Sequence, residues 1–442
     1  MARQGWNVDS SQMAKDTHNP IRHIVEALNL QPNPEKPMIA LSIGDPTVFG
    51  NLKTSDVVRD AVIESVKSGK YNGYGPSTGL QGAKEAIAKY TSNENYTVSP
   101  QDVILCSGCS CALDLSISVI ANPGQNILIP RPGFPIYKTL AEGLGIKVRQ
   151  YNLDPSRGWE ADLQHMESLI DENTAAIIIN NPSNPCGSVY SERHLRDIIQ
   201  LASRNYVPII ADEIYEHLVF KGHKYIPLAS LSSDVPILSC SGLTKRFLIP
   251  GWRLGWIIIN DRNDVLQKVR QGLMVLSQRI IGSNTLVQGA IPKILAETPQ
   301  DFYQSTIDLI ERQAEIAYSL ISEIEGLQPI MPQGAMYMMV KIDMQKFPRF
   351  KSGMDFVQQM VSEESVFCLP GECFQFSGYM RLVLTVPEEQ ITEACARMSE
   401  FCTRHYKSED RNESDSSKYI SSYSKSPQMV IPINNKPTWK SA

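Results

Sequence analysis

The sequence has no apolar run long enough to cross a membrane and no excess of positive charge. Its 442 residues include 42% hydrophobic and 20% charged positions, and the formal net charge is −5. A membrane helix needs about 20 mostly apolar residues in a row, and nucleic acid or an acidic membrane attracts a broadly basic surface. We therefore expect no membrane span and no nucleic-acid partner. The composition is that of a globular protein with two or more domains.

Signals for export and for disulfide bonding are also missing. The stretch from Met1 to Asp16 has no apolar core of a secretory signal and is too acidic for a transit peptide. The nine cysteines are an odd number, which fits free thiols in a reducing compartment better than a disulfide framework. We therefore expect a cytoplasmic location.

One cysteine pair has the spacing of a zinc site, but the second ligand pair of such a site is missing. Cys106 and Cys109 have C-x-x-C spacing, and no comparably spaced pair of cysteines or histidines occurs elsewhere. A structural zinc site needs such a second pair, so we expect no metal.

The same stretch is better interpreted as a strand, a turn and a helix. An apolar run at residues 103–105 precedes small residues and then a helical pattern at 112–120. The backbone N–H groups of such a turn converge on one point where a phosphate can bind, although many similar turns bind nothing. Gly108, Cys109 and Ser110 are the candidate residues.

Short apolar runs alternate with amphipathic stretches through the middle of the chain. We expect strands at residues 127–129, 147–150, 176–180, 208–211, 236–239 and 256–259, and helices at 80–90, 163–170, 192–203 and 265–275. This pattern predicts a mainly parallel sheet covered by helices on both faces. Ligands of such sheets bind at the carboxyl ends of the strands.

Polar residues gather where these strands are expected to end. Asn184 follows one strand, and Asp212 and Tyr215 follow another. A buried carboxylate at Asp212 has to be paired, either in a structural salt bridge or helix cap, or with the protonated ring nitrogen of a cofactor. The Pro-rich segment 181–187 is either a plain loop or a rigid support that presents Asn184 to a phenolic oxygen.

Lys245 lies in an apolar stretch bounded by glycines, and Arg253 follows eight residues later. An isolated lysine of this kind is usually a surface residue whose amine reaches water. A desolvated amine, however, can attack a carbonyl and hold an aldehyde cofactor covalently. The rigid guanidinium of Arg253 suits a phosphate. The accompanying polar residues favour the second interpretation.

These motifs resemble those of class I pyridoxal-phosphate-dependent aminotransferases of fold type I. The resemblance covers roughly residues 10–406, and its motifs are the stretches at 19–22, 42–51, 107–110, 130–134, 181–187, 212–215, 242–255 and 332–337. It implies transfer of an amino group from an amino acid, which we expect to be tyrosine, to a 2-oxo acid such as 2-oxoglutarate. Reactions of kynurenine, alanine or methionine, or a β-lyase reaction, are alternatives.

The resemblance also assigns roles to individual residues. Lys245, Asp212 and Tyr215 are the expected catalytic residues: Lys245 holds the cofactor and moves a proton, and Asp212 keeps the ring nitrogen protonated. Asn184 and Tyr215 bind the phenolic oxygen, and Asn184 also contacts the substrate. Phe134 stacks on the ring, and the phosphate is held by Gly108, Cys109, Ser110 and Arg253.

The remaining expected contacts involve the substrate and a neighbouring subunit. Arg381 binds the substrate carboxylate, with the backbone of Gly44 nearby, whereas an arginine at the start of an apolar strand could also be a hydrated edge residue. Tyr74 reaches the phosphate of the other subunit in a homodimer. The family often has a serine where this chain has Gly242, so Ser241 or Thr244 supplies that hydroxyl.

The expected fold is α/β. We expect a seven-stranded, mainly parallel sheet between helices in a large cofactor-binding domain at 73–325, and a smaller α+β domain built from 10–72 and 326–406 that moves onto bound substrate. Residues 1–9 and the serine-rich stretch 407–442 are expected to be disordered. A non-catalytic ligand-sensing module is the rival, but it has no need for Lys245, Asp212, Asn184 and Arg381 together.

Overall fold

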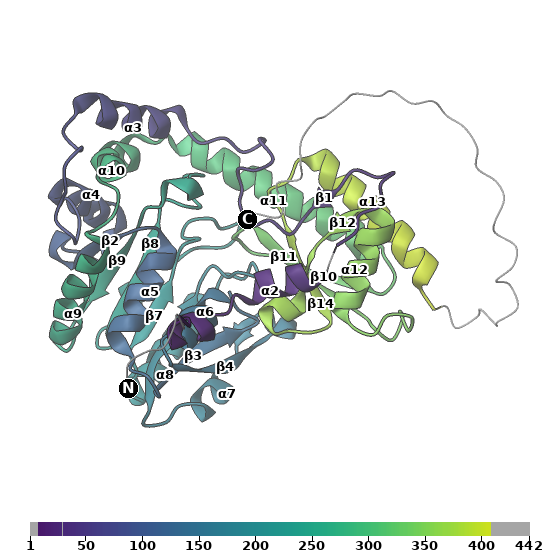
Figure 1. Ribbon diagram of the computed structural model, residues 1–442, viewed down its shortest axis with the longest axis horizontal. Helices are drawn as coiled ribbons and strands as arrows, with labels where there is room; N and C mark the ends of the chain where they lie inside the picture. The colour runs from purple at the N-terminus through teal and green to yellow at the C-terminus, as the bar shows by residue number, and fades with distance from the viewer. Residues whose placement is uncertain (1–7, 29, 408–442) are drawn as a thin grey trace, which may run out of the picture.

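The computed structural model describes residues 8–28 and 30–407. The expected disorder of residues 1–7 and 408–442 lies outside the described residues. Figure 1 shows a large sheet flanked by helices, and a smaller part in which the last helices and strands of the chain lie beside its first strand. In the described part of the chain, no helix is both long enough and apolar enough to cross a bilayer.

The large sheet has eight strands in the order β2-β9-β8-β7-β6-β3-β4-β5. These strands are β2 (Val103–Cys106), β3 (Asn126–Arg131), β4 (Lys147–Asp154), β5 (Glu160–Ala161), β6 (Thr174–Asn180), β7 (Ile209–Asp212), β8 (Ile237–Gly242) and β9 (Gly255–Asn260). The run from β8 to β4 is parallel, whereas β9 is antiparallel to both neighbours and β5 is antiparallel to β4. The α/β class with a mainly parallel sheet is confirmed. Its strand count exceeds the expected seven because the two-residue strand β5 adds to one edge.

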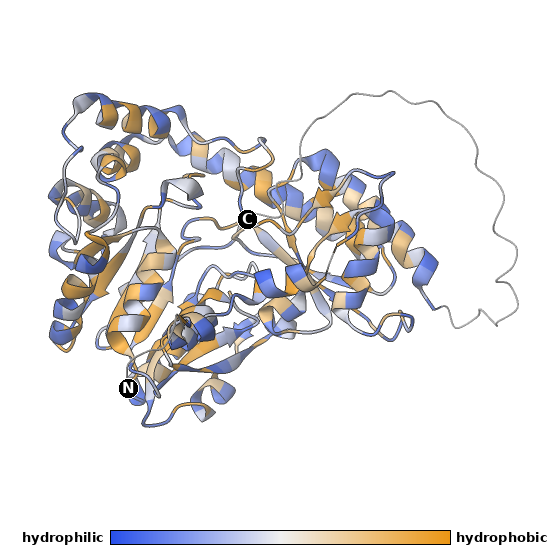
Figure 2. Cartoon of the chain, in the orientation of Figure 1, coloured by the Kyte–Doolittle hydropathy of each residue, from blue (hydrophilic) through white to orange (hydrophobic). Residues whose placement is uncertain are grey.

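Alternate residues of the strands enter two separate cores. On β9, Ile257 and Ile259 face one core, and Trp256 and Ile258 face the other. Each such side chain contributes about 1.5–3 kcal/mol when fully buried. Burial on both faces explains why these strands are continuously apolar in sequence, and Figure 2 shows the strands largely in the hydrophobic colour.

Helices cover both faces of this sheet. The first core takes α5 (Cys109–Ile120), α6 (Ile136–Gly143) and α9 (Gln267–Ser277). The second takes α3 (Asp56–Ser68), α4 (Gln81–Thr91), α7 (Leu163–Ser168), α8 (Glu192–Arg204) and α10 (Thr285–Glu297). The four helices expected from the sequence correspond to α4, α7, α8 and α9.

A second, smaller sheet is antiparallel, with the order β10-β11-β14-β13. Its strands are β10 (Leu327–Ile330), β11 (Tyr337–Ile342), β13 (Leu369–Pro370) and β14 (Tyr379–Val383), and α11 (Gln300–Ser322), α12 (Gly353–Glu364) and α13 (Glu388–His405) pack around it. Met336, Met338 and Met339 are buried here as core-filling residues. The predicted domain boundaries remain a prediction.

The first part of the chain is tied to this C-terminal part. The short helices α1 (Gln12–Asp16) and α2 (Pro20–Ala27) come first, and α2 begins where the Asn19 side chain accepts a hydrogen bond from the Arg22 amide at 3.2 Å. Strand β1 (Ile39–Ala40) then pairs in parallel with β12 (Val366–Phe367). The chain therefore passes through the C-terminal part before it reaches the sheet edge.

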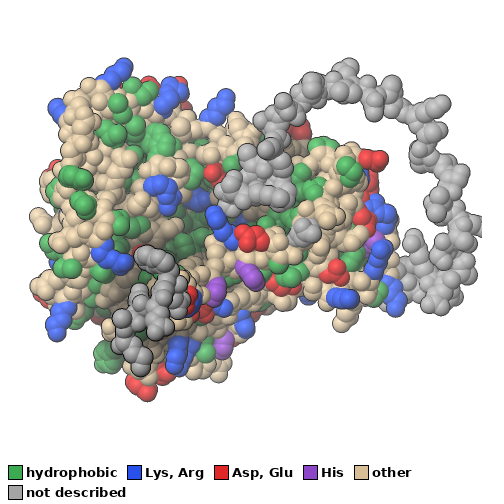
Figure 3. Space-filling model, viewed as in Figure 1, with side chains coloured by type: hydrophobic (Ala, Val, Ile, Leu, Met, Phe, Trp, Pro, Cys, Tyr) green, Lys and Arg blue, Asp and Glu red, His purple; other side chains and the backbone are tan. Residues whose placement is uncertain are grey.

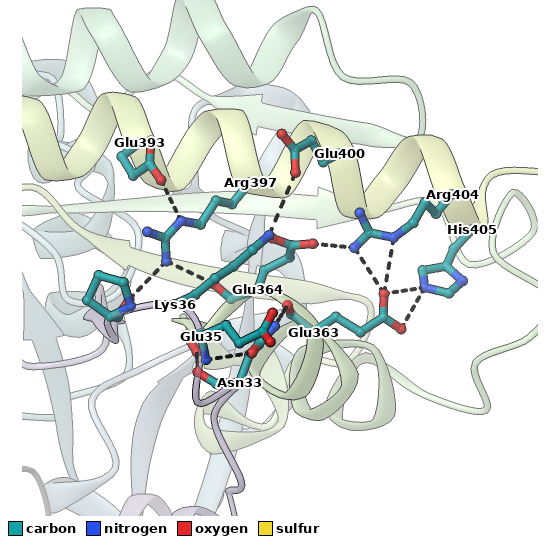
Figure 4. A network of polar contacts seen from close by, with 12 residues as sticks. Asn33, Glu35, Lys36, Glu363, Glu364, Glu393, Arg397, Glu400, Arg404 and His405 are labelled. Atoms are coloured by element: carbon teal, nitrogen blue, oxygen red, sulfur yellow. Dashed lines mark hydrogen bonds and ion pairs between the residues drawn. The ribbon is translucent and has the colours of Figure 1, made fainter. Parts of the chain in front are cut away.

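An ionic cluster fixes this N-terminal segment (Figure 4). The Glu364 carboxylate, with only 1% of its side chain exposed, forms ion pairs with Lys36 and Arg404. Arg397 donates to the carbonyl of Pro37 at 2.9 Å and to that of Glu364 at 3.1 Å. These contacts anchor the start of the segment that carries Ser42 and Gly44.

We expect Glu364→Gln to lower the free energy of unfolding by about 1–3 kcal/mol, because the buried acceptor of two cations loses its charge. The loss stays in this range because Lys36 and Arg404 are 32% and 44% exposed and regain water. Urea denaturation at fixed pH measures the change. Glu64→Gln is the control, since its pair with Lys293 lies on a more exposed surface and such pairs contribute little. Equal losses of unfolding free energy in the two variants would contradict a stabilising role for the ionic cluster around Glu364.

Candidate active site

A cavity of about 620 Å³ opens where the central parallel strands end. Eleven of the residues expected from the sequence line it: Gly44, Cys109, Ser110, Phe134, Asn184, Asp212, Tyr215, Thr244, Lys245, Arg253 and Arg381. Residues that were given no role from the sequence also line it, including Arg22, Ser42, Asn180, Tyr337 and Phe367. Residues from both ends of the sequence thus meet those of the large sheet.

Lys245 follows β8 and is half-buried. Its Nζ donates a hydrogen bond to the carbonyl oxygen of Gly44 at 2.6 Å and lies 5.9 Å from the centre of the Tyr215 ring. The backbone of the N-terminal segment therefore orients the lysine amine toward the cavity.

Asp212 is the last residue of β7 and only 2% exposed. Its carboxylate accepts hydrogen bonds from the Tyr137 hydroxyl at 2.6 Å, the Ile214 amide at 3.3 Å and the Cys109 thiol at 3.6 Å. Burial raises the pKa of Asp212, and these donors act in the opposite direction. No cationic side chain of the described residues pairs with Asp212, so a protonated ring nitrogen in the cavity is a suitable partner.

We expect Tyr137→Phe to raise the pKa of Asp212 further, because a donor to the charged form is removed. If Asp212 acts as a carboxylate, as the sequence predicts, activity on the acidic side should be lost at a pH about one unit higher than in the unmodified protein. The pH profile of kcat/KM measures this shift. Tyr151→Phe is the control, because the Tyr151 hydroxyl donates to the carbonyl of Ile178 instead of a carboxylate. An unchanged acidic limb in Tyr137→Phe would contradict the assignment.

The start of α5 faces the same cavity. Its N-cap is Gly108, with φ +82°, and its first residues are Cys109 and Ser110. The first N–H groups of a helix have no partner within it and attract anions. Arg253 lies against this turn, with Nη2 donating to the Ser107 carbonyl at 3.3 Å. A Cβ at Gly108 would lie 2.5 Å from that Nη2, so only glycine allows the guanidinium this close to the helix start.

Arg381 is a buried cation, and no anionic side chain in the described part of the chain pairs with it. It is 3% exposed, and its Nη1 and Nη2 donate to Asn184 Oδ1 at 3.0 Å and to the Ser42 carbonyl at 2.8 Å. It pairs with no carboxylate of residues 8–28 and 30–407, and its Nε has no hydrogen-bond partner there. Burial lowers its pKa. A buried charge of this kind requires compensation, and a substrate carboxylate can provide it.

Asn184 and Tyr215, which are expected to donate to a phenolic oxygen, both line the cavity. Because Asn184 Oδ1 accepts from Arg381, the amide Nδ2 is the end left to donate to a ligand. The Tyr215 hydroxyl lies 2.7 Å from the hydroxyl of Tyr337. Burial is the main reason why the pKa of Tyr215 is raised, so this hydroxyl keeps its proton.

Three expected residues lie outside the cavity lining. Gly108 is the N-cap residue of α5 and precedes the lining residues Cys109 and Ser110. The Ser241 hydroxyl donates to the Glu213 carbonyl at 3.4 Å, whereas Thr244 lines the cavity. Tyr74 has 91% of its surface exposed.

Sequence reasoning missed several contacts made by long-range packing. Tyr137 belongs to α6, and nothing near it in sequence points to Asp212. Its ring contacts that of Phe134, which precedes the helix and lines the cavity, with 6.0 Å between the ring centres. Tyr337 belongs to the motif at 332–337 but was assigned no role from the sequence. Ser42 enters through its carbonyl, which every residue possesses.

The residues of the cavity fit pyridoxal 5′-phosphate. A helix start with an adjacent guanidinium suits its phosphate, the buried Asp212 suits its ring nitrogen, and Phe134 supplies an aromatic face. The Lys245 amine suits its aldehyde. Fold and site together define a cofactor-dependent α/β enzyme that acts on carboxylate-bearing amines.

Comparisons with known proteins agree with this class. The family model for aminotransferases of class I and II matches residues 36–398. Human tyrosine aminotransferase is 55% identical over 402 residues, which cover 91% of this chain and 88% of the human protein. The tyrosine aminotransferase of Dictyostelium discoideum is 46% identical, covering 92% of this chain and 99% of that protein. The crystal structure of tyrosine aminotransferase from Leishmania infantum has a TM-score of 0.87 at 36% identity, covering 91% and 100% of the two chains.

The chain therefore belongs to the class I and II aminotransferase family, whose cofactor is pyridoxal 5′-phosphate. The resemblance drawn from the sequence motifs is confirmed.

Proposed function

We propose that this chain transfers the amino group of L-tyrosine to 2-oxoglutarate and produces 4-hydroxyphenylpyruvate and glutamate. The observation that carries the proposal is the buried guanidinium of Arg381, which forms no ion pair with a carboxylate of the described residues and lines the same cavity as the Lys245 amine. Arg381 binds the carboxylate that amino acids and 2-oxo acids share, and Lys245 acts at the carbon that carries the amino or oxo group. The choice of tyrosine rests on the high identity to relatives that carry this activity in their names.

The residues of the chain have distinct tasks in this reaction. When bound, pyridoxal phosphate supplies an electron sink that stabilises negative charge at the substrate α-carbon. The Lys245 amine would hold the cofactor through its aldehyde group, and it would also carry the proton to and from the substrate α-carbon. The Asp212 carboxylate keeps the ring nitrogen protonated, and Asn184 Nδ2 and the Tyr215 hydroxyl donate to the phenolic oxygen.

The phosphate is held by fixed positive potential rather than by a lysine. The N–H groups at the start of α5, the hydroxyls of Ser110 and Thr244, and the Arg253 guanidinium are its proposed donors. Phe134 packs on the ring.

We further propose that the active unit is a homodimer. Tyr74 is a large aromatic side chain with 91% of its surface exposed, which fits a residue that reaches the phosphate of the other subunit. The small domain of residues 10–72 and 326–406 closes on bound substrate.

All nine cysteines are free, which supports a reducing location such as the cytoplasm.

The test is the choice of amino donor. Initial rates with 2-oxoglutarate are measured for tyrosine, kynurenine, alanine and methionine at equal concentrations, with pyruvate and ammonia release as the sign of a β-lyase. We expect tyrosine to have the highest kcat/KM. A higher kcat/KM for another donor, or the appearance of lyase products, would contradict tyrosine as the substrate. Neither result would change the family assignment.

A further inference from the structure

Tyr337 lies between Arg381, the proposed carboxylate-binding residue, and Tyr215, the proposed cofactor-binding residue. Neither the sequence nor the proposed function assigns it a role. It begins β11 and is 2% exposed. In the small sheet, Met339 is paired with Arg381 and Tyr337 with Val383, so Tyr337 lies diagonally next to Arg381 on one face. Tyr337 also lines the cavity.

The ring of Tyr337 supports the carboxylate-binding arginine. Arg381 Cζ lies 4.3 Å from the centre of the Tyr337 ring and 5.0 Å from that of Phe374. An aromatic face attracts a guanidinium, and more strongly where water is excluded. Because Arg381 pairs with no described carboxylate, these rings and its two hydrogen bonds hold its plane in position.

The hydroxyl of Tyr337 points the other way, toward the cofactor side of the site. It lies 2.7 Å from the Tyr215 hydroxyl. A Cβ at Gly44 would lie 3.0 Å from it, so the glycine leaves the hydroxyl its space. The charged and titratable groups around the two hydroxyls are Arg381, Asp212 and Lys245.

A hydroxyl has one proton, which determines the direction of this hydrogen bond. If Tyr215 donates its proton to the cofactor, its oxygen can only accept from Tyr337. Accepting that bond makes Tyr215 a stronger donor, because linked hydrogen bonds polarise each other.

We propose that Tyr337 is a positioning residue with two separable tasks: its ring seats Arg381 for the substrate carboxylate, and its hydroxyl directs the Tyr215 proton to the phenolic oxygen of the cofactor. This inference rests on the proposed roles of Arg381 and Tyr215. Tyr337→Phe removes only the second task, whereas Tyr337→Leu removes both.

The hydroxyl is tested by a pH titration of the visible absorption of the holoenzyme without substrate. Tyr215 stabilises the deprotonated oxygen of the chromophore, so Tyr337→Phe should raise the titration midpoint by about 0.5–1 pH unit. A lower midpoint would mean that Tyr215 donates its proton to Tyr337. An unchanged midpoint would mean that the Tyr337 hydroxyl does not orient the Tyr215 proton. Either result would contradict the proposed role of the hydroxyl.

The ring is tested by binding of 3-(4-hydroxyphenyl)propionate, which has the carboxylate but no amine. Tyr337→Leu should weaken binding about tenfold, and Tyr337→Phe should leave it within about twofold. Equal affinity in Tyr337→Leu, or equal weakening in both variants, overturns the ring task. Tyr151→Phe, which removes another buried hydroxyl, should change neither measurement.

The two tests also separate this inference from the proposed function. The titration uses no substrate, so it stands whichever amino acid the enzyme prefers. Failure of the unmodified protein to bind the probe would instead contradict the proposed substrate.

Discussion

Lys245→Ala is expected to lower kcat for amino transfer by on the order of 10⁴-fold or more, because the variant loses both the covalent attachment of the cofactor and the proton carrier. Cofactor should still bind, since the α5 start, Arg253 and Asp212 remain. Steady-state rates and the cofactor retained after dialysis measure the two effects.

Lys341→Ala provides the control for this substitution. Lys341 is an exposed lysine on β11, away from the cavity lining, so its loss should leave the rate unchanged. Near-normal turnover in Lys245→Ala would remove the central assignment of the site.

Arg381→Ala is expected to raise KM for tyrosine and for 2-oxoglutarate alike, with kcat/KM lower by about 30- to 1000-fold. In the proposed function the same guanidinium serves both substrates, because each presents its carboxylate next to the reacting carbon. The variant also leaves Asn184 Oδ1 and the Ser42 carbonyl without their donor. Steady-state kinetics with each substrate varied in turn measures the change.

Arg381→Lys is the matched variant. It keeps the charge but lacks the fork that can engage two oxygens, so its kcat/KM should lie between those of Arg381→Ala and the unmodified protein. A defect confined to one substrate would show that the carboxylate site lies elsewhere.

The sequence predicted the features that follow from local patterns. The apolar runs identified the central strands, and polar residues directly after them, such as Asp212 and Asn184, had to lie at one edge of a parallel sheet. Lys245 and Arg253 lie at the same edge, because the segment that holds them connects the end of β8 to the start of the antiparallel β9.

Features that depend on distant packing could not be predicted in this way. An apolar run does not encode strand direction, so the antiparallel β9 had no sequence signal. The carbonyl of Gly44 meets Lys245 across 201 positions, and Lys36 meets Glu364 across 328. Both contacts arise because the N-terminal segment crosses the C-terminal part. The charges shown in Figure 3, with basic and acidic side chains both dispersed over the visible face, agree with a small net charge but do not locate the site.

The most direct test of the account is one absorption experiment on the purified protein with pyridoxal phosphate. L-Tyrosine is added in excess without any oxo acid, and 2-oxoglutarate is added afterwards. We expect the band of the bound aldehyde cofactor to be replaced by that of pyridoxamine phosphate and then to return. A cofactor band that does not change when tyrosine is added would contradict the proposed substrate. Failure to bind the cofactor at all would contradict the assignment of Lys245 and its cavity.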